Sequence, residues 1–122
     1  MITMTPQEIE QELRQYYCSE NFYKVSPFSN LVMTDGVKAL CTMCQSYWLT
    51  DIIASYQGKR LEAKTTGFQV WTLSKRLTDW LVTCDDGNGN IAVKQVISLS
   101  DFPLPSIKLY CTNGVILLPS EN

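Results

Sequence analysis

The pair Cys41-x-x-Cys44 has the spacing of half a zinc site or of a redox couple. Four thiolates would require Cys84 and Cys111 as well, but these two lie far apart in the sequence. Residues 41 and 44 share the apolar face of a predicted helix, where a free cysteine packs like a small hydrophobic residue. We therefore interpret them as core cysteines and predict no metal and no cofactor.

The chain contains no histidine, which excludes Ser-His and Cys-His nucleophile pairs and histidine metal ligands. Carboxylates for acid–base chemistry could come from Asp35, Asp51, Asp79 or Asp101, and Asp51 is the most informative because it lies in the apolar run Trp48-Leu49-Thr50-Asp51-Ile52. Burial there would favour the neutral acid, although a polar helix face explains the same residue more simply. A ligand-binding or catalytic pocket formed by Trp48, Asp51 and Tyr56 is therefore an alternative function, and no catalytic residue is assigned.

Basic residues form two small groups in a chain whose net charge is −2. A net negative charge does not favour a surface that binds phosphates, and solvated loop charges explain the groups more simply. Nucleic-acid binding is therefore a second alternative, with salt-dependent affinity as its signature. The residues concerned are Lys59, Arg60, Lys64, Lys75 and Arg76.

The N-terminal half of the chain has helical patterns. Thr5-Pro6-Gln7-Glu8 is a capping box, and the apolar spacing after it predicts a helix over about 5–17. Residues 18–33 have the composition of a loop with aromatic anchors. A second helix is predicted from Thr34 to Gln57, with an interruption at Gln45-Ser46 left open, and residues 58–67 are predicted to form a connection.

Residues 68–118 have the alternation and turn signals of short β-strands. Asp85 to Asn90 supplies turn residues, and Asn113-Gly114 between two apolar runs favours a type I′ hairpin. The predicted fold class is α+β, with N-terminal helices packed on a roughly five-stranded antiparallel meander sheet in two layers. The length of 122 residues predicts a single domain, 1–122, with a helical part at about 5–57 and a β part at about 68–118.

The strand that begins at Phe68 carries large apolar side chains on both faces. Gln69 and Trp71 alternate with Phe68 and Val70, and Tyr110 raises the same question on a later strand. Either both faces are buried or one face meets a partner. The sequence therefore predicts a partner-binding surface that includes Trp71, Tyr110 and Gln69.

No basic and apolar leader pattern opens the sequence, and no apolar run approaches the roughly 20 residues of a membrane span. We expect a cytoplasmic protein that does not enter membranes. Its five cysteines are then expected to be reduced.

Several segments together resemble a family of short bacterial and phage or plasmid proteins, classified as a domain of unknown function. The resemblance covers roughly residues 10–121 and implies a cytosolic accessory protein, often on mobile elements, that acts by binding other proteins. It implies no activity. The segments are Thr34-Asp35-Gly36-Val37-Lys38, Tyr47-Trp48-Leu49-x-Asp51-Ile52-Ile53-Ala54-Ser55-Tyr56-Gln57, Phe68-Gln69-Val70-Trp71, Cys84-x-Asp86-Gly87-Asn88-Gly89-Asn90, Asp101-Phe102-Pro103-Leu104 and Thr112-Asn113-x-x-Ile116-Leu117-Leu118-Pro119-Ser120-Glu121.

The favoured hypothesis is a small non-enzymatic protein-binding module, acting on another protein or on a second copy of itself. Its sharper form is a mobile-element-associated inhibitor or modulator of a host or defence complex. The shortage of catalytic groups and the two-sided apolar strand are the observations on which it depends.

Overall fold

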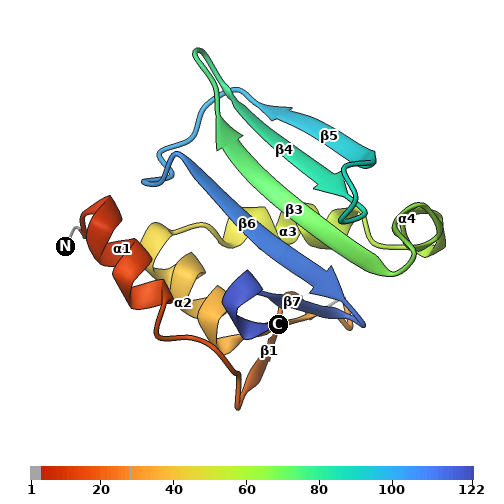
Figure 1. Cartoon of the computed structure of the whole chain (residues 1–122), viewed down its shortest axis with the longest axis horizontal. Helices are drawn as coiled ribbons and strands as arrows, with labels where there is room; N and C mark the ends of the chain where they lie inside the picture. The colour runs from red at the N-terminus through yellow and green to blue at the C-terminus, as the bar shows by residue number, and fades with distance from the viewer. Residues whose placement is uncertain (1–3, 28) are drawn as a thin grey trace.

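The computed structural model describes residues 4–27 and 29–122, which form an α+β fold with four helices and a seven-stranded sheet (Figure 1). The predicted fold class is therefore confirmed. The helices are α1 (Pro6–Leu13), α2 (Asp35–Cys44), α3 (Tyr47–Ser55) and α4 (Lys59–Thr65). The strands are β1 (Phe22–Lys24), β2 (Val32–Thr34), β3 (Phe68–Lys75), β4 (Trp80–Asp85), β5 (Ile91–Ile97), β6 (Ser106–Thr112) and β7 (Val115–Leu117), and a 3₁₀ turn, η1 (Pro119–Glu121), follows.

The sheet is larger than predicted and is mixed, with the strand order β1-β2-β7-β6-β3-β4-β5. Residues 18–33, predicted as a loop, supply the two additional strands β1 and β2. β2 runs parallel to β7, with Met33 opposite Ile116, and both of these side chains are buried in the core. This pair joins segments from the two ends of the chain, which local alternation does not encode.

The strands do not form a simple meander, because the connection from β5 to β6 passes the ends of β4 and β3. Phe102 and Leu104 in this connection are buried, and the Phe102 ring meets Trp80 edge-on at 6.1 Å between centroids. The prolines of this segment prevent it from forming a strand within the sheet. Burial of Phe102 and Leu104 instead stabilises the segment as a connection. The Asn113-Gly114 turn is confirmed as type I′, because both residues have positive φ.

Helix α1 begins as predicted, since Thr5 and Glu8 form the reciprocal capping box. It ends at Leu13 rather than near residue 17. The backbone N–H groups of Gln15 and Tyr16 already make i−3 hydrogen bonds there, and the chain turns away toward β1.

The second predicted helix is interrupted, because Gln45 adopts the left-handed conformation with φ 51° and separates α2 from α3. The predicted connection 58–67 contains α4 instead. Its buried residues Leu61 and Thr65 are spaced i, i+4, which is too short a pattern to distinguish from a polar loop.

Figure 1 views the sheet from the face that no helix covers; α1, α2 and α3 lie behind it. Trp71, Val82 and Leu109 point toward those helices and are at most 1% exposed. On the open face, Phe68 and Tyr110 pack against each other with their ring centroids 5.0 Å apart. Within the described ranges, no helix has the length and apolar character needed to cross a bilayer.

Candidate functional site

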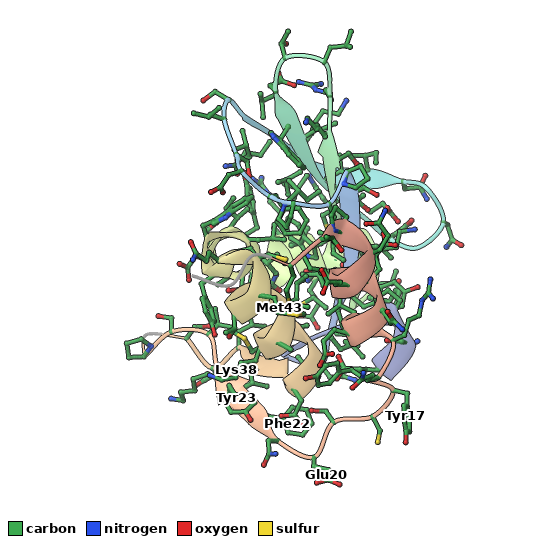
Figure 2. All side chains as sticks on the ribbon, turned by 90° about the vertical axis from the view of Figure 1, so that its left-hand side faces the viewer. Tyr17, Glu20, Phe22, Tyr23, Lys38 and Met43 are labelled. Carbon is green, nitrogen blue, oxygen red and sulfur yellow. The ribbon has the colours of Figure 1, made fainter. Side chains whose placement is uncertain are left out.

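A groove of about 610 Å³ between α1 and α2 is the candidate functional site. We call it the tyrosine groove, because Tyr16 and Tyr17 from the loop after α1 and Tyr23 from β1 line it. Figure 2 shows Tyr17 and Glu20 on that loop, with Phe22 and Tyr23 next to each other below α2. Tyr17 is 74% exposed in the groove lining, and Phe22, which precedes Tyr23 on β1 and lies outside the lining, is 56% exposed.

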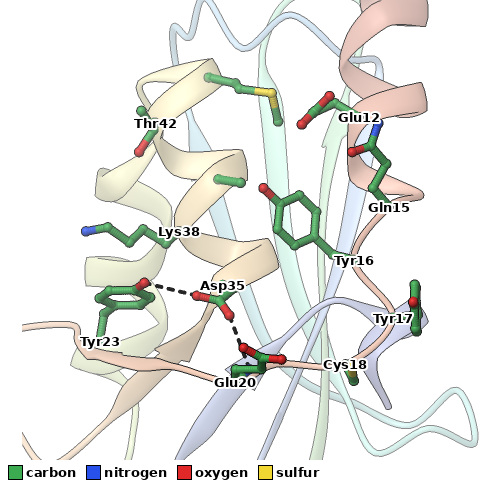
Figure 3. Close-up of a pocket in the computed structure, with 12 residues that line it drawn as sticks. Glu12, Gln15, Tyr16, Tyr17, Cys18, Glu20, Tyr23, Asp35, Lys38 and Thr42 are labelled. Carbon is green, nitrogen blue, oxygen red and sulfur yellow. Dashed lines mark hydrogen bonds between the residues drawn. The ribbon is translucent and has the colours of Figure 1, made fainter.

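Asp35, the first residue of α2, holds the wall of the tyrosine groove in place. Its carboxylate accepts a hydrogen bond from the Tyr23 hydroxyl at 3.0 Å and bonds from the backbone N–H groups of Glu20 and Asn21 at 3.2 and 3.3 Å (Figure 3). The Ser19 hydroxyl accepts the backbone N–H of Asp35 at 3.0 Å. These bonds order the loop against α2 without using its exposed rings.

The same contacts shift the acidity of both partners. Burial acts to raise the pKa of Asp35, but hydrogen bonds, first from Tyr23 and then from the loop, outweigh it and hold the pKa below the ordinary aspartate value. The hydrogen bond to Asp35 raises the pKa of Tyr23. Asp35 is therefore an ionised structural anchor and not a proton donor at neutral pH.

A second carboxylate secures the start of α2 from the C-terminal side. Glu121 in η1 accepts hydrogen bonds from the Thr34 hydroxyl at 2.6 Å and from the backbone N–H of Gly36 at 3.2 Å. The Ser120 hydroxyl donates to the Tyr16 carbonyl at 2.7 Å, so η1 also holds the loop that carries the groove tyrosines. Segments from both ends of the chain thus fix the tyrosine groove.

The lining of the groove combines aromatic faces with charge. Lys38 Nζ lies 4.5 Å from the Tyr23 ring centroid, which is a cation–π contact. Three carboxylates line the groove, those of Glu12, Glu20 and Asp35, against the single ammonium of Lys38. This arrangement can bind an aromatic or cationic side chain.

The structure does not gather the cysteines into the zinc or redox site considered from the Cys41-x-x-Cys44 spacing. Burial raises the pKa of Cys41 and Cys44 to about 11. Burial likewise raises the pKa of Cys84 and Cys111 to about 12. Across residues 4–27 and 29–122, no three metal-ligating side chains gather. Buried thiols of this kind are poor nucleophiles.

The three residues predicted to contact a partner lie on opposite faces of the sheet. Trp71 and Gln69 are buried under the helices at 1% and 5% exposure, and the Trp71 indole donates to the Gln69 side chain at 2.8 Å. The Gln69 amide exchanges two hydrogen bonds of 2.9 Å with the Gln57 amide. Only Tyr110 faces the open side, so this set forms no common surface.

The residues of the predicted pocket also separate. Trp48 packs against the core from α3, and Asp51 is exposed, so the burial that made it an acid–base candidate is absent. Tyr56 instead donates to the Gln95 side chain at 2.6 Å and lines a pocket of about 330 Å³ between α4 and β5. Neither Trp48 nor Asp51 contributes to that pocket.

The predicted basic residues divide between two ends of the sheet. Lys59, Arg60 and Lys64 belong to α4. Lys75 and Arg76 lie at the β3–β4 turn, where Arg76 pairs with Asp79 through two hydrogen bonds of 2.5 and 2.7 Å. The five residues therefore form no continuous basic surface, which removes the main support for nucleic-acid binding.

The sequence did not indicate the tyrosine groove. Tyr16 and Tyr17 fall at the end of the helix predicted over about 5–17, and Tyr23 falls in the segment 18–33 predicted as a loop. The charged residues Glu12 and Lys38 have the pattern of ordinary helix surface. The signal that was present is the density of aromatic residues over 16–23 within an otherwise polar stretch.

Comparison with known proteins gives a family without an assigned activity. No curated protein and no solved structure matches the chain. The model of the family of unknown function DUF6876 matches residues 7–122, which is nearly the whole sequence. The chain therefore belongs to the family of unknown function DUF6876.

Proposed function

We propose that this protein is a non-enzymatic protein-binding module whose binding site is the tyrosine groove. The observation that carries the proposal is the gathering of three tyrosine rings in the lining of one groove, where Tyr17 is 74% exposed, while the exposed Phe22 lies next to Tyr23 on β1 outside that lining. Tyrosine is enriched at protein interfaces, because it offers a large contact area with a polar end and loses few rotamers. The order imposed by Asp35 further lowers the entropy cost of binding.

In its sharper form, the proposal makes the protein a cytoplasmic, mobile-element-associated inhibitor or modulator of a host or defence complex. The family resemblance motivates this form, since small accessory proteins on such elements frequently act by binding. Self-association through the same groove is the competing form, and measurement of the mass in solution separates the two.

Capture of a partner from the lysate of the natural host tests the proposal. The baits are the tagged protein, the double variant Tyr17→Ala/Phe22→Ala, and the matched control Leu77→Ala, whose side chain is fully exposed at the β3–β4 turn. We expect one stoichiometric partner on the first and third baits and its loss from the double variant. Equal capture by all three correctly folded baits would reject the tyrosine groove as the binding site.

A second candidate function is the binding of a small organic anion between α4 and β5. The pocket there has an apolar floor that includes the buried Leu61, and Arg60, Lys64 and Lys94 are among its lining residues. Cationic side chains around an apolar floor favour a ligand that carries both a carboxylate or phosphate and an apolar body. A rise in melting temperature with such anions, abolished in Arg60→Gln/Lys64→Gln, is the expected result.

A further inference from the structure

We infer that the tyrosine groove binds a cationic segment, an exposed stretch of chain in a partner protein that carries arginine or lysine side chains. This inference rests on the proposed protein-binding function and specifies the chemistry of the partner. It follows from the charge balance of the lining, from a cation already held on one of the rings, and from the exposure of the remaining rings.

The charge balance favours an incoming cation. Glu12 projects from α1, Glu20 lies on the loop, and neither carboxylate forms an ion pair with any residue in the described part of the chain. The Asp35 carboxylate already accepts hydrogen bonds from the loop and from Tyr23. Its negative charge attracts a cation, but its oxygens are engaged on the side that faces the loop. Separate cations of the partner would therefore pair with Glu12 beside α1 and with Glu20 on the loop.

Lys38 does not neutralise these two carboxylates. Its ammonium lies over Tyr23 at 4.5 Å, and Figure 3 shows it at the α2 side of the groove, whereas Glu12 and Tyr16 lie toward α1. Lys38 is thus an internal example of the contact that we infer for the partner. Repulsion from Lys38 would direct a second cation toward the α1 side.

The free rings provide the remaining contacts. Tyr16 is half-buried with its ring between α1 and α2, and Tyr17 is 74% exposed beyond it. Arginine can stack its guanidinium on an aromatic ring and donate N–H groups to a carboxylate, and it combines these two contacts better than lysine. The volume of about 610 Å³ lies in the range of sites that accept a few side chains.

The affinity for such a segment is expected to depend on salt concentration. Exposed ion pairs contribute little individually, so the affinity would arise from several contacts and would fall as salt screens them. A neutral segment of the same shape would keep the ring contacts and lose the charge contacts. Charge is therefore the property to vary in the test.

The experiment titrates the isotope-labelled protein with a short capped peptide that carries several arginines, and follows amide NMR shifts. The matched peptides replace each arginine with citrulline, which is neutral and almost isosteric, or with glutamate. We expect the arginine peptide to shift residues 12–23 and 35–43, and the citrulline peptide to bind about tenfold more weakly. Glu12→Gln/Glu20→Gln should remove most of that preference, while Leu77→Ala should keep it.

Equal affinity for the arginine and citrulline peptides, no binding of the arginine peptide, or binding unaffected by Glu12→Gln/Glu20→Gln would each overturn the inference. Such a failure is distinguishable from failure of the proposed function. If Tyr17→Ala/Phe22→Ala still abolishes capture of the natural partner, the groove binds protein and only the cationic segment is wrong.

Discussion

At the scale of single residues, Asp35 shapes the candidate site through its hydrogen bonds. Its carboxylate joins α2 to the loop after α1 and to β1 through Tyr23. Asp51, which the sequence favoured, is exposed and lines neither pocket described above. The two carboxylates differ in the number of hydrogen-bond donors around them. The donors to Asp35 come from residues distant in the sequence, so the sequence alone does not indicate them.

The pH dependence of stability tests the role of Asp35. Because the folded pKa lies below the ordinary value of about 4, the carboxylate stabilises the protein above that value, and the contribution disappears as the pH falls through the folded pKa. We expect Asp35→Asn to be less stable at neutral pH and to lose less stability on acidification than the wild type. Urea denaturation from neutral pH down to about pH 3 measures both. If the free energy of unfolding fell equally with pH in the wild type and in Asp35→Asn, this role for Asp35 would be contradicted.

The cysteines give a second prediction at this scale. Of the five thiols, only Cys18 is exposed, and burial raises the pKa of the other four to about 11 or 12. A thiol reagent at neutral pH should therefore modify one thiol rapidly in the folded protein and all five in denaturant. Cys18→Ser should abolish the rapid phase. Rapid modification of two or more thiols in the native protein would show that the core thiols are accessible.

At the scale of elements, the junction of β2, α2 and η1 is the most constrained part of the fold. Gly36 in the first turn of α2 lies under η1, and a Cβ there would lie 2.6 Å from both Glu121 Oε1 and Leu118 Cδ1. Two segments quoted for the family resemblance, Thr34 to Lys38 and Thr112 to Glu121, thus meet in space. Their meeting positions the loop that carries the groove tyrosines.

Substitution of Gly36 tests this junction. Gly36→Ala should lower the free energy of unfolding by about 1–3 kcal/mol, because the new methyl group displaces Glu121 and Leu118. The control is Gln45→Gly at the other end of α2, where the left-handed φ of 51° favours glycine and stability should hold or rise. Chemical denaturation measures both variants. An unchanged Gly36→Ala would mean that η1 can move away at no cost.

Elements with local signals could be predicted from the sequence, whereas those defined by distant contacts could not. The Thr5 cap and the Asn113-Gly114 turn follow from residue type and spacing alone, and both are present. The parallel pair β2–β7 and the placement of β1 depend on contacts between the two ends of the chain. The tyrosine groove depends on contacts of the same kind, so the aromatic density over 16–23 could mark its loop but could not place that loop against α2.

At the scale of the whole molecule, the open sheet face and the tyrosine groove are separate surfaces. The open face is partly closed by its own contacts, because Val70 is 6% exposed and lies on the same face as the packed pair Phe68 and Tyr110. The groove instead leaves Tyr17 and Glu20 exposed and Glu12 half-buried, and neither glutamate forms an ion pair within the described residues. We therefore propose the groove as the surface that binds another protein, with the sheet as the scaffold that fixes it.

Site-specific photo-crosslinking in the natural host tests whether the tyrosine groove binds a partner. Benzoylphenylalanine replaces Tyr17 in one version of the protein and Leu77 in the other, both at exposed positions in different loops. We expect a discrete cross-linked partner at position 17, lost in an added Phe22→Ala substitution, and no such product at position 77. A partner that crosslinks only at position 77, or equally at both positions, would contradict binding at the groove.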